Sequence, residues 1–260
     1  SSIRQINQAA SCSSFYLPKI FIRVRYPEQI LKLLDLFSDS VRIISVFIIH
    51  KFCMENADSY IQTMIKANEC SQKPLYMMPI FESASMTDLR NRYDLLYALK
   101  DKLGKIEQLV LNIRVGGNDF CHLFGFRRHA DESIHKIRPI SNIFSDIITV
   151  YGMDYVISGP VWEYYSGSSW KTGLLQEISD DRLCGFIGKT VIHPNQIAVI
   201  NDAYRVPQKD YADARRILNW DTSSDSFVSA NIDRERMDEY KTHGNWAKQV
   251  LWMADAYGIV

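Results

Sequence analysis

The stretch GFIGKTVIHPNQI, residues 185–197, contains a short apolar run that stops at His193 and Pro194 and is followed directly by a helix-like segment. Proline has no amide hydrogen and a fixed φ, so it suits the first turn of a helix but not the interior of a sheet. The stretch therefore indicates a strand followed by a helix, which is half of a βα unit. Ligands of α/β folds bind at the carboxyl ends of the strands, so His193 is a candidate substrate-binding residue.

The same order of elements recurs along the chain. Strands are predicted at residues 19–25, 41–51, 74–82, 108–117, 154–159 and 189–192. Helices are predicted at residues 27–37, 55–67 and 86–103, within 131–151, near 173–182, and at 195–204, 208–218 and 244–258. The strands show little internal alternation, which is typical of a parallel sheet buried on both faces. Strict βα alternation predicts an α/β fold, either a (β/α)8 barrel or a doubly wound sheet. No phosphate-binding loop follows the first strand, which disfavours the doubly wound alternative.

A change of composition near residue 219 predicts a domain boundary. Residues 1–218 contain the βα units and form the expected barrel-like domain. Residues 219–231, NWDTSSDSFVSAN, are polar and linker-like. Residues 219–260 are therefore expected to be a linker and a C-terminal helical extension.

Composition excludes several classes of partner. The 260 residues are 47% hydrophobic and 23% charged, which is ordinary for a globular protein with a sizeable core. Lys and Arg together number 30 and so do Asp and Glu, so nothing suggests a nucleic-acid or anionic-membrane partner. No apolar run approaches the ~18 residues of a membrane span. Five scattered cysteines without a CxxC pair predict reduced thiols and a cytoplasmic location.

Two acidic residues follow neighbouring predicted strands. Glu82 ends PIFE and Asp119 follows VGGN, about one βα unit further along the chain. Two carboxylates at one edge of a sheet suit Mg²⁺, which commonly takes one or two carboxylates plus waters and substrate oxygens. Gly116 and Gly117 favour this interpretation, because a glycine pair lets the backbone approach a ligand closely. The alternative is that Glu82 caps a helix and that Asp119 is a loop acid.

Basic residues lie at two other strands. The alternation in FIRVR places Arg23 and Arg25 on one face, where an inward arginine would suit carboxylate binding. A surface-facing pair is the alternative. Lys51 ends FIIHK at the equivalent edge, either as a functional residue or as a solvated lysine.

Two further segments have alternative interpretations. CHLFGFRRHADESIH, residues 121–135, has no usual zinc spacing, and we interpret it as a loop and helix start. The aromatic residues of VWEYYSGSSW, residues 161–170, suit a pocket wall or a subunit contact. Together with the C-terminal helix, they predict a homo-oligomer. Trp246 is expected to pack with Val250 and Met253 on that helix.

Several motifs together resemble a known family. GFIGKTVIHPNQIAVINDAY, followed by VPQKDYADARRIL, resembles the last strand and helices of the citrate lyase β-subunit-like family, the HpcH/HpaI aldolase superfamily. MMPIFES resembles its glutamate strand, LNIRVGGNDF its Gly-x-Asp strand and FIRVR its substrate-arginine strand. FIIHK resembles its Pro-Lys strand, with His50 where proline is usual. EYKTHGNWAKQVLWMADAYGI resembles the C-terminal segment of a branch of carbon–carbon bond lyases with a TIM-barrel fold.

The resemblance implies a Mg²⁺-dependent (β/α)8 TIM-barrel enzyme. Such enzymes make or break a carbon–carbon bond beside a carbonyl in an oxo-acid, a hydroxy-acid or an acyl-CoA thioester. Glu82 and Asp119 would be the metal ligands. Arg23 would neutralise a substrate carboxylate or developing enolate charge, and Lys51 would be a second catalytic residue. Small-molecule carboxylates or acyl-CoA would be the partners.

One departure from the family concerns its first two strands. These strands, with an acidic Asp-Leu-Glu-Asp-type segment, have no counterpart in this sequence. Either the sequence lacks the true N-terminus that would contain them, or the barrel is incomplete. The competing functional hypothesis is a catalytically lapsed barrel that binds a metabolite or a protein partner.

Overall fold

The computed structural model describes residues 2–12, 17–220, 228–231 and 233–260. Its chain divides into two compact units, residues 1–192 and residues 193–260. Each unit has an apolar core of its own, so each is described separately below.

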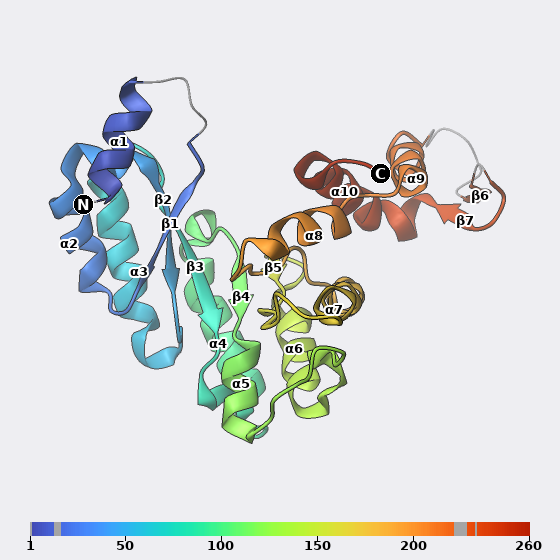
Figure 1. The fold of residues 1–260 in the computed structure, drawn as a ribbon, viewed down its shortest axis with the longest axis horizontal. Coiled ribbons are helices and arrows are strands. Elements are labelled where there is room, and N and C mark those ends of the chain that lie inside the picture. Colours follow the sequence, from blue (N-terminus) through green and yellow to red (C-terminus); the bar gives the residue numbers. More distant parts are fainter. Residues whose placement is uncertain (1, 13–16, 221–227, 232) are drawn as a thin grey trace. The chain divides into compact units, whose positions relative to one another are not determined.

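The first unit is built on five parallel strands that lie side by side in chain order. These are β1 (Ile20–Val24), β2 (Ile44–Ile49), β3 (Tyr76–Phe81), β4 (Ile113–Val115) and β5 (Ile157–Ser158) (Figure 1). Beyond β5, the predicted sixth strand is reduced to one parallel bridge between Gly159 and Lys189. The short ladder has a local cause, because Pro160 has no amide hydrogen with which to continue it.

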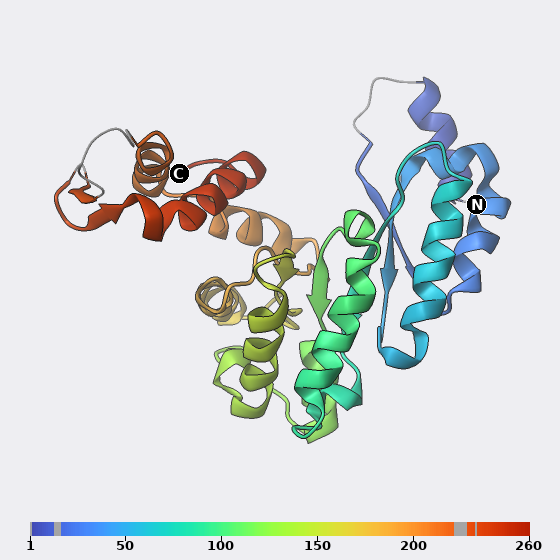
Figure 2. The same ribbon diagram turned by 180° about the vertical axis from the view of Figure 1, so that it is seen from behind.

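Helices connect the strands, as parallel pairing requires. The α-helices of this unit are α1 (Ser2–Cys12), α2 (Glu28–Phe37), α3 (Met54–Glu69), α4 (Arg92–Gly104), α5 (Gly117–Phe124), α6 (Arg138–Tyr151) and α7 (Trp170–Cys184). Short 3-10 turns are η1 (Ser38–Ile43), η2 (Ala84–Thr87), η3 (Glu107–Leu109) and η4 (Ile134–Lys136). Helices α3, α4 and α6 lie behind the strands in Figure 1 and in front of them in Figure 2. They therefore cover one face of the sheet.

Alternate strand residues face opposite sides of this sheet. One set packs under the helices in the apolar core and includes Phe47, Ile49, Met77, Phe81, Ile113 and Val115. The other set lies outside that core and includes Arg23, Ile48, Ile80, Arg114 and Ser158. The pairing aligns Arg23 with Ile48, Ile80 with Arg114, and Arg114 with Ser158. We call the side that carries this second set the second face of the sheet.

The second unit is mostly helical. It contains α8 (Asn195–Ala203), α9 (Gln208–Leu218), the antiparallel pair β6 (Val228–Ala230) and β7 (Met237–Glu239), and α10 (Tyr240–Tyr257). Helices α9 and α10 pack together around Ala214, Ile217, Ala247 and Val250. Trp246 and Met253 pack against the same cluster, which confirms the packing predicted for this helix.

Three details differ from the sequence-based expectation. Residues 228–230 of the predicted linker form a strand, whereas residues 221–227 of that linker lie outside the described residues. The chain divides after residue 192 and not after residue 218, because α9 packs on α10. The helix expected from residue 86 begins at Arg92, because a 3-10 turn precedes it.

Other expectations concern membranes and thiols. No helix in the described parts of the chain is long and apolar enough to cross a bilayer. Cys53, Cys70, Cys121 and Cys184, the cysteines whose side chains are described, are free thiols. In the described residues β1 is at one edge of the sheet, and the absence of two preceding strands stays a prediction.

Candidate functional site

The two predicted metal ligands lie together at the carboxyl edge of the sheet. Glu82 directly follows β3, and Asp119 lies in the first turn of α5, which starts just after β4. Gly116 lies next to both residues in the structure. A Cβ placed on Gly116 would be 2.3 Å from Glu82 Cβ, 2.5 Å from Glu82 Oε2 and 3.2 Å from Asp119 Oδ2. Both carboxylates therefore lie against the Gly116 backbone.

The local electrostatics favour a cation between these carboxylates. Burial raises the pKa of Glu82, which is 6% exposed, and the negative charge of Asp119 raises it further. The backbone N–H of Lys51 donates to Glu82 Oε1 at 2.8 Å and opposes this rise. A bound cation would relieve the repulsion between the two carboxylates.

Basic groups surround the carboxylate pair. Arg23 is close enough to favour the charged form of Glu82. Burial lowers the pKa of His50, and the positive charges of Arg23 and Lys51 lower it further, against the opposing effect of Asp119. The structure thus brings Arg23, Lys51, Glu82 and Asp119 into one electrostatic neighbourhood.

Arg114 is a site residue that our sequence analysis missed. It lies on β4, two residues before Gly116 and on the same face of the sheet. Burial lowers the pKa of its guanidinium, whereas the charge of Glu82 opposes this change. Its buried Nε has no hydrogen-bond partner among the described residues. The sequence feature that could have identified Arg114 is its position as a charged residue inside the apolar run LNIRV.

Lys51 contributes to the site through its backbone. Its φ is 50°, a left-handed conformation that is uncommon outside glycine, and its side chain is exposed. Asn56 Nδ2 donates to the Lys51 carbonyl at 2.9 Å, which holds this turn in place. A catalytic role for the Lys51 ammonium group stays a prediction.

The two glycines have a packing function in this structure. Gly116 allows Glu82 to lie against the backbone, as described above. A Cβ on Gly117 would lie 2.6 Å from Ile134 Cδ1 and 2.8 Å from Pro160 Cβ. Protein atoms therefore occupy the space that a side chain would need, and contact of either glycine with substrate stays a prediction.

His193 belongs to the second unit, where its ring Nδ1 accepts a hydrogen bond from the Asn195 amide at 3.2 Å. Its predicted role in substrate binding also stays a prediction.

The donor set of Glu82 and Asp119 suits a hard cation. Among the described residues, no three His, Cys, Asp or Glu side chains group together as a metal site. A pair of carboxylates is nevertheless sufficient for Mg²⁺, which keeps several waters and takes its other oxygens from substrate. The residues present therefore fit the metal that the sequence predicts.

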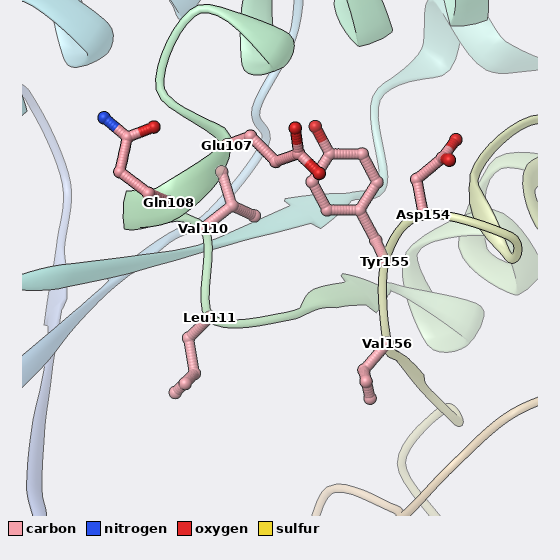
Figure 3. Close-up of a pocket in the computed structure, with 7 residues that line it drawn as sticks. All are labelled: Glu107, Gln108, Val110, Leu111, Asp154, Tyr155 and Val156. Atoms are coloured by element: carbon pink, nitrogen blue, oxygen red, sulfur yellow. The ribbon is translucent and has the colours of Figure 1, made fainter. Parts of the chain in front are cut away.

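A hollow lies at the opposite edge of the sheet. It has a volume of about 530 Å³ and is lined by Glu107, Gln108, Val110, Leu111, Asp154, Tyr155 and Val156 (Figure 3). These residues precede β4 and β5, so the hollow is at the amino edge. Asp154 is already paired there with Lys100 at 2.5 Å. We therefore assign the chemistry to the carboxylate pair and not to this hollow.

A second charged cluster is buried beneath α7. Lys189 Nζ lies 2.9 Å from Glu177 Oε1 and 2.6 Å from Asp181 Oδ2, and all three side chains are fully buried. His135 Nε2 lies 2.7 Å from Asp181 Oδ1. Arg128 is 3.5 Å from Glu177 and lies over the ring of buried Trp162. This cluster joins α7 to η4 and to the bridge at Lys189.

Comparison with known proteins agrees with the motifs. Residues 1–259 match the family described as C–C bond lyase of the TIM-barrel fold. The chain belongs to this C–C bond lyase family. The resemblance predicted from the sequence is therefore confirmed at the level of the family. No curated protein matches the sequence.

Two solved structures are similar to this lyase family member. CitE from Mycobacterium tuberculosis, in complex with magnesium, acetoacetate and coenzyme A, aligns with a TM-score of 0.58 and 18% identity. That alignment covers 96% of this chain and 83% of CitE. The citrate lyase β subunit of the same organism, with oxaloacetate and magnesium, aligns with a TM-score of 0.46 and 18% identity over 71% of this chain and 72% of that subunit. At such identity, the CitE alignment supports the fold alone.

Proposed function

We propose that this protein is a Mg²⁺-dependent lyase that cleaves or forms a carbon–carbon bond beside the carbonyl of an oxo-acid, a hydroxy-acid or an acyl-CoA thioester. The observation that supports the proposal is the placement of Glu82 and Asp119 against the Gly116 backbone at the carboxyl edge of a parallel sheet. Such edges hold the active sites of α/β enzymes.

Each residue near the pair has a proposed role. Glu82 and Asp119 would hold the cation, which when bound supplies Lewis-acid polarisation of a substrate oxygen. The Lys51 amide fixes the orientation of the Glu82 carboxylate through its hydrogen bond to Oε1. Arg23 would receive a substrate carboxylate or stabilise charge that develops during bond cleavage.

The substrate class is supported by chemistry and by distant likeness. Guanidinium groups near a carboxylate pair suit an anionic substrate. The CitE structure contains acetoacetate and coenzyme A, and we extend an oxo-acid or acyl-CoA substrate to this protein as part of the proposal. A cytoplasmic location and a homo-oligomer stay predictions.

Mg²⁺ titration of the wild type and of Asp119→Asn tests the proposal. Calorimetry should show one site in the wild type and at least a tenfold weaker site in Asp119→Asn, because one of two charged ligands is lost. The circular dichroism spectrum should be unchanged, since Asp119 is partly exposed and outside the apolar core. Asp94→Asn, an exposed carboxylate on α4, is the matched control.

An activity assay distinguishes the lyase hypothesis from the hypothesis of a catalytically lapsed barrel. A lyase should cleave a hydroxy-acid or its CoA ester only with Mg²⁺ present. Metabolite binding without turnover would favour the lapsed barrel. Equal Mg²⁺ affinity in the wild type and Asp119→Asn would remove the metal assignment.

A further inference from the structure

We infer that Arg114, together with His50, is a specificity-determining residue that binds a second carboxylate of the substrate, so that the site selects dicarboxylates over monocarboxylates. The inference rests on the proposed function, because it concerns the same edge of the sheet. It adds residues to which neither the sequence motifs nor the family resemblance gave a role.

The strand register places three residues of this face at one level. Ile80 pairs with Arg114, and Ile49, the last residue of β2, pairs with Pro79. His50 lies in the turn that follows β2 and continues this register to the level of Ile80. His50, Ile80 and Arg114 therefore form one layer, with His50 at the end of β2 and the other two on β3 and β4. Glu82 lies two residues beyond Ile80 and thus on the same face, in the layer above. A ligand held at Glu82 would reach this lower layer with its other end.

Two nitrogens in this layer are unsatisfied. Arg114 Nε and His50 Nε2 are buried, and neither has a hydrogen-bond partner among the described residues. A buried polar atom without a hydrogen-bond partner costs free energy, and the cost is larger for an atom of a charged group such as the guanidinium. Ser158, which pairs with Arg114 along the strand, bonds instead to Asn112 Nδ2 at 2.6 Å. A carboxylate would satisfy Arg114 with charge-assisted hydrogen bonds.

The charges of the site also bear on the ligand. Arg23 and Arg114 carry two positive charges, and Glu82 and Asp119 carry two negative charges when both are ionised, so these four groups are neutral together. The ammonium group of Lys51 is exposed and screened by solvent, so it is left out of this balance. A divalent cation on the carboxylates would leave two positive charges uncompensated. A ligand with two carboxylates matches that charge, whereas a monocarboxylate leaves one guanidinium unpaired.

Malate and lactate are the probes, because they share a 2-hydroxy-acid group and differ by one carboxylate. Their dissociation constants would be measured by calorimetry, with and without Mg²⁺, for the full chain. The wild type should bind malate about tenfold or more tightly than lactate. Arg114→Gln should weaken malate binding about 10- to 100-fold and change lactate binding less than about twofold, since one charge-assisted contact is lost. Arg114→Lys keeps the positive charge, so its affinity for malate should lie between the affinities of the wild type and of Arg114→Gln.

Arg90→Gln is the matched control, because it removes an exposed positive charge of the same unit, in the loop before α4. It should leave the preference for malate unchanged. His50→Gln should weaken malate binding by a smaller factor than Arg114→Gln.

Three results would overturn the inference. The first is a wild type that binds malate and lactate equally, or that binds Mg²⁺ but neither acid. The second is equal weakening of both acids by Arg114→Gln. The third is loss of the preference in Arg90→Gln. A different result is a wild type that prefers malate over lactate without Mg²⁺ and shows no Mg²⁺ binding at all. That result would overturn the proposed function but would agree with this inference.

Discussion

At the scale of single residues, Gly116 decides how the two carboxylates meet. The closest approach at this position is to Glu82 Cβ, an atom fixed by the backbone of β3 and not the free end of a flexible side chain. A side chain at residue 116 would therefore have to move Glu82 or the start of α5. Asp119 would be affected with them, because α5 begins at the next residue.

Gly116→Ala should destabilise the protein and weaken Mg²⁺ binding. Overpacking of this kind costs about 1–3 kcal/mol in the free energy of unfolding. Urea denaturation and Mg²⁺ calorimetry measure the two effects. Gly104→Ala at the end of α4 is the control, because a Cβ there meets nothing within 4 Å. That substitution should be neutral or stabilising by up to about 1 kcal/mol. If Gly116→Ala is as stable as the wild type, the close approach does not constrain this turn.

At the scale of elements, the cluster beneath α7 attaches that helix to the sheet and to η4. Glu177 also accepts the backbone N–H of Ile134 at 2.9 Å, so a helix side chain satisfies an amide of η4. Trp162 of the aromatic segment is buried in this region, and the Tyr164 hydroxyl donates to the Arg128 carbonyl at 2.9 Å. These aromatic residues therefore contact their own unit, which weakens the reason for expecting them at a subunit contact.

The charge of His135 should make stability depend on pH. Burial opposes that charge, but hydrogen bonds to Asp181 and Cys184 raise the pKa of His135 to about 9 from an ordinary 6.5. Because the folded-state pKa is the higher one, the stabilisation is fully present below pH 6.5. It declines as the pH rises and is lost above about pH 9, a change of about 3–4 kcal/mol at most.

Urea denaturation at pH 6 and pH 9 measures this change. His135→Gln should be less stable than the wild type at pH 6 and should lose less stability between the two pH values. His129→Gln is the control, because the side chain of His129 is 81% exposed and its pairing with Glu132 is at the surface. Its pH dependence should follow the wild type. An unchanged slope in His135→Gln would show that the dependence does not come from His135.

At the scale of the whole molecule, the chain has two separate apolar cores. The buried residues of the first core extend from Val24 to Phe186, and those of the second from Val206 to Ala254. Neither buried cluster includes residues from both sides of the division at residue 192. The elements that carry Glu82, Asp119, Arg23 and Arg114 all belong to the first unit.

A fragment of residues 1–192 should therefore fold by itself. It should unfold in one cooperative transition, as single domains with a core of this kind do. It should also bind Mg²⁺ within about threefold of the affinity of the full chain. Thermal denaturation followed by circular dichroism, together with calorimetry, measures both. A fragment without a cooperative transition would show that residues 193–260 are needed for the fold of the first unit.

The sequence by itself determined strands β1 to β5, most of the helices and which strand ends carry acids, whereas α1, α5 and the pair β6 and β7 were not predicted. The runs FIRVR, VFIIH and MMPIF, and the amphipathic helices between them, express local periodicities that a single segment contains. Glu82 and Asp119 could be identified for the same reason, because each follows its own apolar run. The family could also be recognised, since its motifs are short and continuous in the chain.

The tertiary structure decided everything that depends on residues distant in sequence. Whether Arg114 faces the carboxylates is set by its register with β3, and the need for glycine at residue 116 is set by Glu82. The pairing of Lys189 with Glu177 and Asp181, and the packing of α9 on α10, likewise depend on contacts between elements. Propensity and periodicity act over a few residues, whereas register, burial and charge pairing arise when the elements pack.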